Sequence, residues 1–428
     1  MIGNDNSKRL KGDILMKHKG NCIIGQSGGP TAAINASLSG VLQGILENDL
    51  YHKVYGMVNG IEGLLQGKYL DLSNLFKTQE DLDKLTHTPA MYLGSCRFKL
   101  PDYTVSEEVY EELFNFFEDH AISTFFYIGG NDSMDTVLKL SNYAKAHNRA
   151  VNIIGIPKTI DNDLPLTDHT PGFGSAAKYV ATSLLEIAHD TYIYNIPSVT
   201  IVEIMGRNAG WLTAASILAR TSYSPAPDLI YLPESHFSIE RFIEDVKEIQ
   251  ATRKNVIIAV SEGIKDEEGR YISASTSTVD AFGHKQLCGA GKTLENILKA
   301  ELGCKVRSIE LNVLQRSASH IASQTDLLEA VRIGKAAALL GAQGETAKMI
   351  CYKRLSNAPY EIETFAYDIA AIANQEKTVP LSWINERGND LTEEAISYLR
   401  PLIEGEVVIS YANGIPSYCD ISHLHGSY

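Results

Sequence analysis

The amino-acid sequence predicts an α/β protein of the doubly wound type, in which helices cover both faces of a parallel sheet. Short apolar runs recur along the 428-residue chain, and each is followed by a turn and a helical pattern. The runs are continuously apolar, which is typical of parallel strands that are buried on both faces. Glycine- and aspartate-rich stretches follow most of these runs. Open α/β sheets bind ligands beyond the carboxyl ends of their strands, so these stretches are where we expect the site.

Six runs carry the strand pattern: Cys22–Ile24, Thr124–Ile128, Asn152–Ile156, Val199–Ile204, Asp228–Leu232 and Val256–Val260. Amphipathic helices are predicted between them, most clearly at Ser133–His147 and Ser175–Asp190. The polar and then glycine-rich stretch Ile264–Gly291 predicts an excursion between core elements. From about Val379 the chain is interpreted as an appended or returning segment, with a charged helix at Thr392–Leu399.

Composition excludes several classes of function. The net charge is −14 and no basic stripe is visible, so nucleic acid is not an expected partner. The N-terminus has no apolar signal segment, and no apolar run approaches the roughly 20 residues of a membrane span. The six cysteines are scattered without a CxxC pair, which is typical of reduced thiols. We therefore expect a cytoplasmic protein of two or three domains that does not bind membranes.

Two loops have the composition of anion sites. In Gly25–Pro30, glycines would let backbone N–H groups approach an anion at the start of a helix, although a simple tight turn is an equal alternative. The loop Gly129–Ser133 also joins a strand to a helix, and Asp132 or Ser133 could simply cap that helix. A carboxylate at Asp132 is unusual beside an anion site, unless a cation lies nearby or the site excludes a ligand.

The loop Pro157–Asp163 carries two carboxylates, Asp161 and Asp163, and the amine of Lys158. Carboxylates can hold Mg²⁺, and one of them could accept a hydroxyl proton as a general base. A lysine supplies a point charge for a phosphoryl group. The alternative is a solvated Asx turn, but the recurrence of such loops after successive strands favours a functional interpretation.

A fourth loop, Met205–Gly210, places Arg207 at a strand end, where an arginine is suited to bind a phosphoryl group unless it is merely a surface residue. The stretch Gly289–Thr293 resembles the end of a Walker A loop. That motif requires a glycine where this chain has Gln286, so we discount it.

Together, the GGxxS, TIDND and MGR loops and the distal pair Gln315-Arg316 resemble the phosphofructokinase family, in particular its pyrophosphate-dependent members, from about Cys22 to Ile350. The resemblance implies two Rossmann-like doubly wound α/β domains with the active site in the cleft between them. Residues 1–171 with about 320–380 would form the phosphoryl-donor domain. Residues 172–319 with about 381–428 would form the sugar-phosphate domain. One arginine of the sugar-phosphate clamp comes from an adjacent subunit in family members, which implies a homodimer or homotetramer.

The resemblance also implies roles for individual residues. Asp161 would be the general base for the 1-hydroxyl of fructose 6-phosphate, assisted by Lys158, Asp132 and Arg207. Contacts to this substrate are implied for Thr159, Ile160, Met205, Gly206, Glu262, Arg307 and Arg316, the two last as the clamp on the 6-phosphate. Contacts to the donor are implied for Gly28, Gly29, Arg97, Gly130, Asn131 and Ser133. Mg²⁺ ligands are implied at Asn131, Asp132 and Asp163, although many members have aspartate at the position of Asn131.

Two positions indicate which donor is used. Family members that use ATP carry glycine at the positions of Asp132 and Lys158, whereas those that use pyrophosphate resemble this chain at both. A carboxylate at Asp132 would repel the α-phosphate of a nucleotide, and Lys158 would compensate the charge on pyrophosphate. The resemblance thus implies reversible, Mg²⁺-dependent phosphorylation of fructose 6-phosphate by pyrophosphate, a glycolytic step.

Three alternative functions agree less well with the sequence. An ATP-dependent phosphofructokinase is disfavoured by Asp132 and Lys158. A non-catalytic regulatory subunit would be expected to lose its base or its clamp, yet Asp161, Arg207 and Arg316 are all present. A dinucleotide oxidoreductase is disfavoured because no GxGxxG follows the first strand with an acidic residue about 20 positions later.

Overall fold

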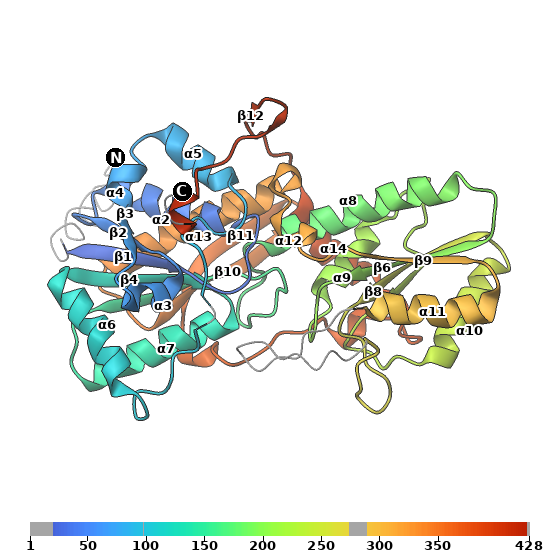
Figure 1. The fold of residues 1–428 in the computed structure, drawn as a ribbon, viewed down its shortest axis with the longest axis horizontal. Coiled ribbons are helices and arrows are strands. Elements are labelled where there is room, and N and C mark those ends of the chain that lie inside the picture. Colours follow the sequence, from blue (N-terminus) through green and yellow to red (C-terminus); the bar gives the residue numbers. More distant parts are fainter. Residues whose placement is uncertain (1–19, 97, 274–288, 426–428) are drawn as a thin grey trace, which may run out of the picture.

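The chain folds into two α/β halves, each built on its own sheet, as Figure 1 shows. The computed structural model describes residues 20–96, 98–273 and 289–425. The first half contains a seven-stranded sheet in the order β11-β10-β5-β4-β1-β2-β3. Its strands are β1 (Asn21–Gln26), β2 (Val54–Met57), β3 (Tyr69–Asp71), β4 (Ile122–Gly129), β5 (Asn152–Pro157), β10 (Lys348–Asn357) and β11 (Tyr360–Asp368).

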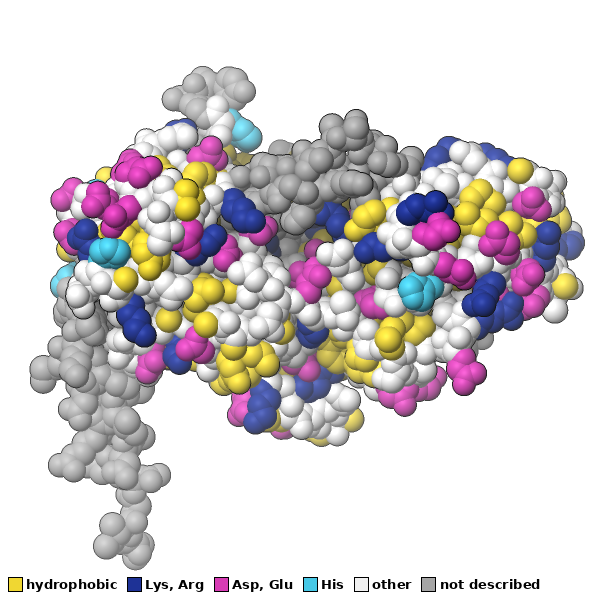
Figure 2. Space-filling model, turned by 90° about the horizontal axis from the view of Figure 1, so that it is seen from below, with side chains coloured by type: hydrophobic (Ala, Val, Ile, Leu, Met, Phe, Trp, Pro, Cys, Tyr) yellow, Lys and Arg dark blue, Asp and Glu magenta, His cyan; other side chains and the backbone are white. Residues whose placement is uncertain are grey.

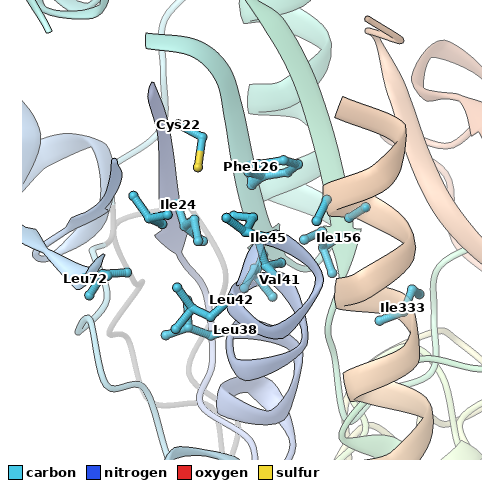
Figure 3. Close-up of a cluster of buried hydrophobic side chains, with 14 of the residues drawn as sticks. Cys22, Ile24, Leu38, Val41, Leu42, Ile45, Leu72, Phe126, Ile156 and Ile333 are labelled. Atoms are coloured by element: carbon cyan, nitrogen blue, oxygen red, sulfur yellow. The ribbon is translucent and has the colours of Figure 1, made fainter. Parts of the chain in front are cut away.

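The five inner strands of this sheet are parallel, and the edge strands β3 and β11 are antiparallel to their neighbours. Alternate residues of each inner strand face opposite sides, and both sides are covered. Ile24 and Phe126 belong to a core on one face, which Figure 3 shows in close-up, while Ile23 and Phe125 belong to a second core on the other face. This burial on both faces is why the strands read as continuous apolar runs.

Helices supply the outer layers of the first half. The core of Figure 3 is covered by α2 (Ile34–Asn48), α4 (Leu72–Leu75), α5 (Gln79–His87) and α13 (Gln324–Ala342). The opposite core is covered by α3 (Gly60–Leu65), α6 (Glu107–Asp119) and α7 (Asn131–Ala146).

The second half contains a four-stranded parallel sheet in the order β7-β8-β6-β9. Its strands are β6 (Ser198–Ile204), β7 (Leu229–Tyr231), β8 (Asn255–Ser261) and β9 (Lys305–Glu310). One face packs against α8 (Phe173–Tyr192), α9 (Trp211–Ala215) and α14 (Glu393–Leu399). The other face packs against α10 (Ile239–Gln250) and α11 (Ala290–Leu302). The short helix α12 (Leu314–Ser317) connects this half to the first.

The predicted α/β class is confirmed, and all six predicted runs correspond to strands. Asp228–Leu232 is one residue longer than β7 at each end, and α8 extends two residues beyond Ser175–Asp190 at each end. The two main sheets contain five further strands, β2, β3, β9, β10 and β11, that the sequence did not suggest.

The C-terminal segment contacts both halves. Val379, Leu391 and Leu399 belong to the core of the second half. The chain then forms the small projecting hairpin β12 (Tyr411–Ala412) and β13 (Ile415–Pro416), visible at the top of Figure 1. Beyond it, the N–H of Cys419 donates to Thr88 Oγ1 of the first half at 3.0 Å. The domain boundaries given above stay a prediction, and this last contact is one that they did not anticipate.

On the face drawn in Figure 2, acidic and basic side chains are interspersed and form no basic stripe. Within the described ranges, no helix combines the length and the apolar character needed to cross a bilayer.

Candidate active site

A cleft of about 860 Å³ lies between the two halves, where the loops that follow the central strands meet. In the first sheet β1 lies between β2 and β4, so the chain order reverses there. Such a reversal is where open α/β sheets bind ligands. Residues of both halves line the cleft, so its two walls can hold two different substrates against each other.

Most of the predicted site residues line this cleft. They are Gly28, Gly29, Gly130, Asn131, Asp132, Ser133, Lys158, Thr159, Asp161, Asp163, Arg207, Glu262 and Arg316. Thus loops that are far apart in the sequence come together as the sequence pattern predicted.

Lys158 directly follows β5, lines the cleft and is almost fully buried. Its Nζ donates to the carbonyl oxygen of Gly29 at 2.7 Å. Gly28 has a φ of +83°, and a Cβ there would lie 3.1 Å from the Lys158 amine, so glycine leaves room for the ammonium group. Burial lowers the pKa of Lys158 to about 8, although the carboxylates of Asp161 and Asp163 oppose the shift. The amine therefore lies in a position to meet a phosphate group that enters beside the glycine loop.

Asp161 and Asp163 follow β5, and both line the cleft. The N–H of Asp161 donates to Thr159 Oγ1 at 3.0 Å, which fixes the turn. Burial, together with Glu262, raises the pKa of Asp161. Burial, together with Asp161, also raises the pKa of Asp163. A carboxylate whose pKa is raised toward neutrality is better suited to accept a proton from a hydroxyl group than an ordinary surface carboxylate.

The wall formed by the second half carries Arg207 and Glu262. The backbone N–H of Gly206 donates to Glu262 Oε1 at 3.4 Å, which orients that carboxylate. Gly206 has a φ of +142°, and a Cβ there would lie 2.6 Å from the Ala209 carbonyl oxygen, so this tight turn requires glycine. Arg207 Nε is buried and has no hydrogen-bond partner among the described residues. A buried guanidinium donor of this kind is suited to an incoming phosphoryl or sugar oxygen.

Comparison with known proteins agrees with this geometry. The family model described as phosphofructokinase matches residues 21–340. The chain belongs to the phosphofructokinase family. It is 41% identical over 405 residues to a Halomonas elongata protein named pyrophosphate--fructose 6-phosphate 1-phosphotransferase, covering 94% of this chain and 96% of that protein.

Two solved structures titled pyrophosphate-dependent phosphofructokinase are also similar. The protein from Marinobacter aquaeolei is 38% identical with a TM-score of 0.83, covering 93% of this chain and 95% of that chain. The protein from Nitrosospira multiformis is 36% identical with a TM-score of 0.84, covering 94% and 96%.

Four residues that the phosphofructokinase resemblance assigned to substrate contacts do not line the cleft. Ile160 is 7% exposed and packs in the core of the second half. Met205 and Gly206 contact cleft elements through their backbone N–H groups. That of Gly206 donates to Glu262, and that of Met205 donates to Oε1 of Gln315, the residue before Arg316, at 3.2 Å. The predicted donor residue Arg97 lies outside the described residues.

Arg307 is the fourth residue, and it lies on β9 away from the cleft. Its guanidinium donates to Asp190 Oδ2 at 2.7 Å and to Thr191 Oγ1 at 3.0 Å. Within one chain, therefore, Arg307 cannot join Arg316 in a clamp at this position, and its predicted role depends on a neighbouring subunit.

The described residues that could hold Mg²⁺ are few. Asp163 Oδ1 is buried and has no hydrogen-bond partner among them, which suits a metal ligand. No group of three or more histidine, cysteine, aspartate or glutamate side chains in the described ranges is arranged to hold a metal ion. Mg²⁺ is commonly held by one or two carboxylates together with substrate phosphates and water.

Asn131 has a different set of contacts. Its Oδ1 accepts from the N–H of Asn374 at 2.9 Å, and its Nδ2 donates to the carbonyl oxygen of Gln375 at 2.7 Å. Both polar atoms of the amide are therefore engaged with a segment more than 240 positions away in the sequence. This arrangement gives the predicted donor and metal residue Asn131 a structural use.

The cleft also contains residues that sequence reasoning missed. Ser95, Lys99, Asn208 and residues 374–376 all line it. Ser95 Oγ donates to the Gly28 carbonyl oxygen at 2.8 Å. This bond supports the glycine loop of residues 25–30, called the donor loop here. A lysine two positions after Arg97 was an available signal for a further cation near the donor. Residues 374–376 have no motif, and only the path of the folded chain brings them to the cleft.

The discounted Walker-like stretch is indeed no phosphate loop. The carboxylate of Glu203 accepts the N–H groups of Gly289 and Gly291 at 3.2 and 2.8 Å. The N-terminus of α11 is thus already occupied by a protein anion.

Proposed function

We propose that this protein catalyses the reversible, Mg²⁺-dependent transfer of a phosphoryl group from pyrophosphate to the 1-hydroxyl of fructose 6-phosphate. The products would be fructose 1,6-bisphosphate and phosphate, a step of glycolysis. The observation that carries the proposal is the pair Lys158 and Asp132, which line the same cleft as Asp161. The name of the Halomonas elongata relative, which is similar over nearly the whole chain, supports the same reaction.

The residues of the cleft can perform each part of this transfer. Asp161 would accept the proton of the sugar 1-hydroxyl as its oxygen attacks the nearer phosphorus of pyrophosphate. The bond from that phosphorus to the bridging oxygen breaks, and phosphate leaves with the bridging oxygen. Lys158 and Arg207 would stabilise the charge that develops on the transferred group, because phosphoryl transfer depends chiefly on positioning and electrostatics.

Substrate orientation would follow from the two walls. Glu262 would accept a hydrogen bond from the sugar, with Arg316 on its 6-phosphate. The glycine loop and Ser133 would face pyrophosphate. Asp132 and Asp163 are the residues that would hold Mg²⁺, which supplies positive charge to the pyrophosphate oxygens.

Donor choice rests on a steric and electrostatic argument. Asp132 lies at the start of α7 and lines the cleft. Its carboxylate would occupy the space and oppose the charge of the α-phosphate of a nucleotide, whereas pyrophosphate ends before that point. The ammonium of Lys158 would balance the charge of the shorter donor.

We infer a homodimer or homotetramer, because Arg307 lies at the surface beside α8, where it could complete the sugar-phosphate site of a neighbouring subunit. A cytoplasmic location is proposed on the substrates and on the five described cysteines, all of which are free thiols.

The test is an aldolase-coupled assay of purified protein with fructose 6-phosphate and Mg²⁺, comparing pyrophosphate with ATP. We expect turnover with pyrophosphate and none with ATP. An Asp161→Asn protein prepared identically controls for contaminating enzyme. Turnover with ATP alone would overturn the donor assignment, and absence of turnover with both would favour a regulatory subunit.

A further inference from the structure

The segment that leaves the first half for the second lines part of the cleft. Residues 374–379, called the crossing segment here, follow the short helical turn Ile369–Ala371 of the first half and end at Val379 in the core of the second half. Asn374, Gln375 and Glu376 line the cleft. Next to them is Lys377, whose side chain turns away from the cleft and toward the loop that carries the two aspartates.

Lys377 holds this loop, residues 161–168 and called the base loop here, near both of its ends. Its backbone N–H donates to the Asp163 carbonyl oxygen at 2.7 Å. Its ammonium donates to the carbonyl oxygens of Asp168 and Thr167 at 2.8 and 3.1 Å and approaches Asn162 Oδ1 at 3.4 Å. The loop between Asn162 and Asp168 is therefore closed around a single amine.

Asn162, between Asp161 and Asp163, has a strained backbone that needs this support. Its φ is +53°, in the left-handed region, and it is fully buried. Non-glycine residues keep such a conformation only where their surroundings fix it. Here Asn162 Nδ2 donates to the hydroxyl of Tyr398 at 2.9 Å, and that hydroxyl donates to the Asp168 carbonyl oxygen at 2.6 Å. Lys377 thus fixes the amide from one side and Tyr398 fixes it from the other.

Lys377 also reaches the loop that carries Arg207. Its carbonyl oxygen accepts from Trp211 Nε1 at 3.0 Å, and its ammonium lies 5.3 Å from the centre of the Trp211 ring. Trp211 begins α9 directly after this loop. The preceding residue, Glu376, accepts from Asn208 Nδ2 at 3.0 Å. One short stretch of chain therefore connects the base loop of the first half with the loop of residues 205–210 in the second half, called the arginine loop here.

We propose that Lys377 is a positioning residue for the transfer: it sets the carboxylate of Asp161 and the guanidinium of Arg207 at their working separation. Lys377 touches no reacting atom and acts through the backbone of the two loops. The three acceptors of its ammonium are two backbone carbonyls and one amide, which suits a structural anchor rather than an ion-pair partner. The inference rests on the proposed function, because it assumes that Asp161 and Arg207 act on the same substrates.

The first experiment compares Lys377→Met with Lys178→Met. Lys178 on α8 is an apt control, because its buried ammonium also holds the C-terminal segment, donating to the Gly405 carbonyl oxygen at 2.6 Å and to Glu406 at 3.0 Å. Its contacts, however, are remote from the base loop. Each variant is assayed for kcat and for the KM of both substrates, and its Tm is measured.

We expect Lys377→Met to lower kcat by about 10²-fold with both KM values little changed, because displacement of a catalytic group by about 1 Å costs this much. Lys178→Met should lower Tm comparably and leave kcat near that of the wild type. Lys377→Arg, which retains charge and N–H donors, should give an intermediate kcat. Equal effects of the two methionine variants on kcat would overturn the inference.

Two further outcomes are covered by this design. If Lys377→Met does not fold, Lys377→Arg is compared with Lys178→Arg, and an undiminished kcat in Lys377→Arg would overturn the inference. A wild-type protein inactive with pyrophosphate and fructose 6-phosphate would count against the proposed function. An active wild type with an unaffected Lys377→Met would count against this inference alone.

Discussion

Replacement of Lys158 by methionine removes one buried positive charge from the donor end of the cleft and nearly conserves side-chain volume. Lys158 is only 2% exposed, and its amine donates to the Gly29 carbonyl oxygen at 2.7 Å. Burial disfavours its charged form, and the nearby carboxylates of Asp161 and Asp163 favour it. The ammonium is thus already placed in the cleft where the proposed transfer would develop negative charge.

The size of the effect follows from this burial. Two unit charges about 4 Å apart interact by about 4 kcal/mol at the effective dielectric constant of a protein site. Loss of one preorganised donor to a developing oxyanion typically costs about 2.7 to 4 kcal/mol in the barrier. Both estimates predict that Lys158→Met lowers kcat by about 10² to 10³-fold. The KM for pyrophosphate should rise less, because the interaction is strongest in the transition state.

The pH profile provides a second readout with a definite sign. Lys158 lowers the pKa of Asp161, against the upward effects of burial and of Glu262. Loss of Lys158 therefore raises the pKa of Asp161. Asp161 must be ionised to accept a proton, so the acidic limb of kcat/KM should move to higher pH in Lys158→Met.

The assay is the aldolase-coupled measurement of kcat and KM over a range of pyrophosphate concentrations and pH values. Lys178→Met controls for loss of stability, because Lys178 is a comparable buried lysine whose ammonium contacts the C-terminal segment instead of the donor loop. A kcat reduced by less than about tenfold, or an acidic limb that moves to lower pH, would refute the role given to Lys158.

Three further predictions concern the base, the donor and a buried histidine. Asp161→Ala should lower kcat by about 10² to 10⁴-fold with little change in substrate affinity measured by calorimetry, and near-normal turnover would show that another group is the base. The double variant Asp132→Gly with Lys158→Gly should weaken turnover with pyrophosphate and admit ATP in the coupled assay, and full retention of pyrophosphate turnover would contradict the account of donor choice. His169 is buried between the carboxylates of Asp168 and Glu329; burial alone lowers its pKa, but the two carboxylates outweigh burial and raise the pKa from 6.5 to about 9. Its stabilising effect is thus complete below about pH 6.5 and is lost as pH rises through about 9. Denaturant unfolding should therefore show a steeper loss of stability between pH 7 and 10 in the wild type than in His169→Asn, and equal slopes would contradict this assignment.

The parts of the fold that the sequence predicted share a physical cause. Strands β1, β4, β5, β6 and β8 are covered on both faces, so their apolar runs are continuous and stand out from the loops. Ligand loops then follow from topology, because the carboxyl ends of parallel strands lie at one edge of a sheet. The hairpin β10–β11 was missed because its outer part alternates between covered and exposed residues, and β2 and β3 were missed because they are only four and three residues long.

The site residues divide in a similar way. A motif identifies a loop but does not separate the residues that face the ligand from those that hold the loop. Ile160 belongs to the same TIDND motif as Asp161, yet its apolar side chain packs in the core of the second half. Arg307 lies away from Arg316 within one chain, and no property of a single sequence places one subunit against another. The crossing segment has no motif, because its role arises only from the path between the two halves.

The crossing segment gives a physical reason for an asparagine at position 131. The Asn131 amide accepts one backbone N–H and donates to one backbone carbonyl of this segment. An aspartate could accept the same N–H, but its second oxygen would face the Gln375 carbonyl oxygen and repel it, so only an amide satisfies both partners. Where many family members have aspartate, this chain therefore has an amide that anchors the crossing segment. Asn131 binds the crossing segment to the loop of residues 129–133. Lys377, which belongs to that segment, binds it to the base loop. The loop of residues 129–133, the base loop and the arginine loop are thus connected through one stretch of chain.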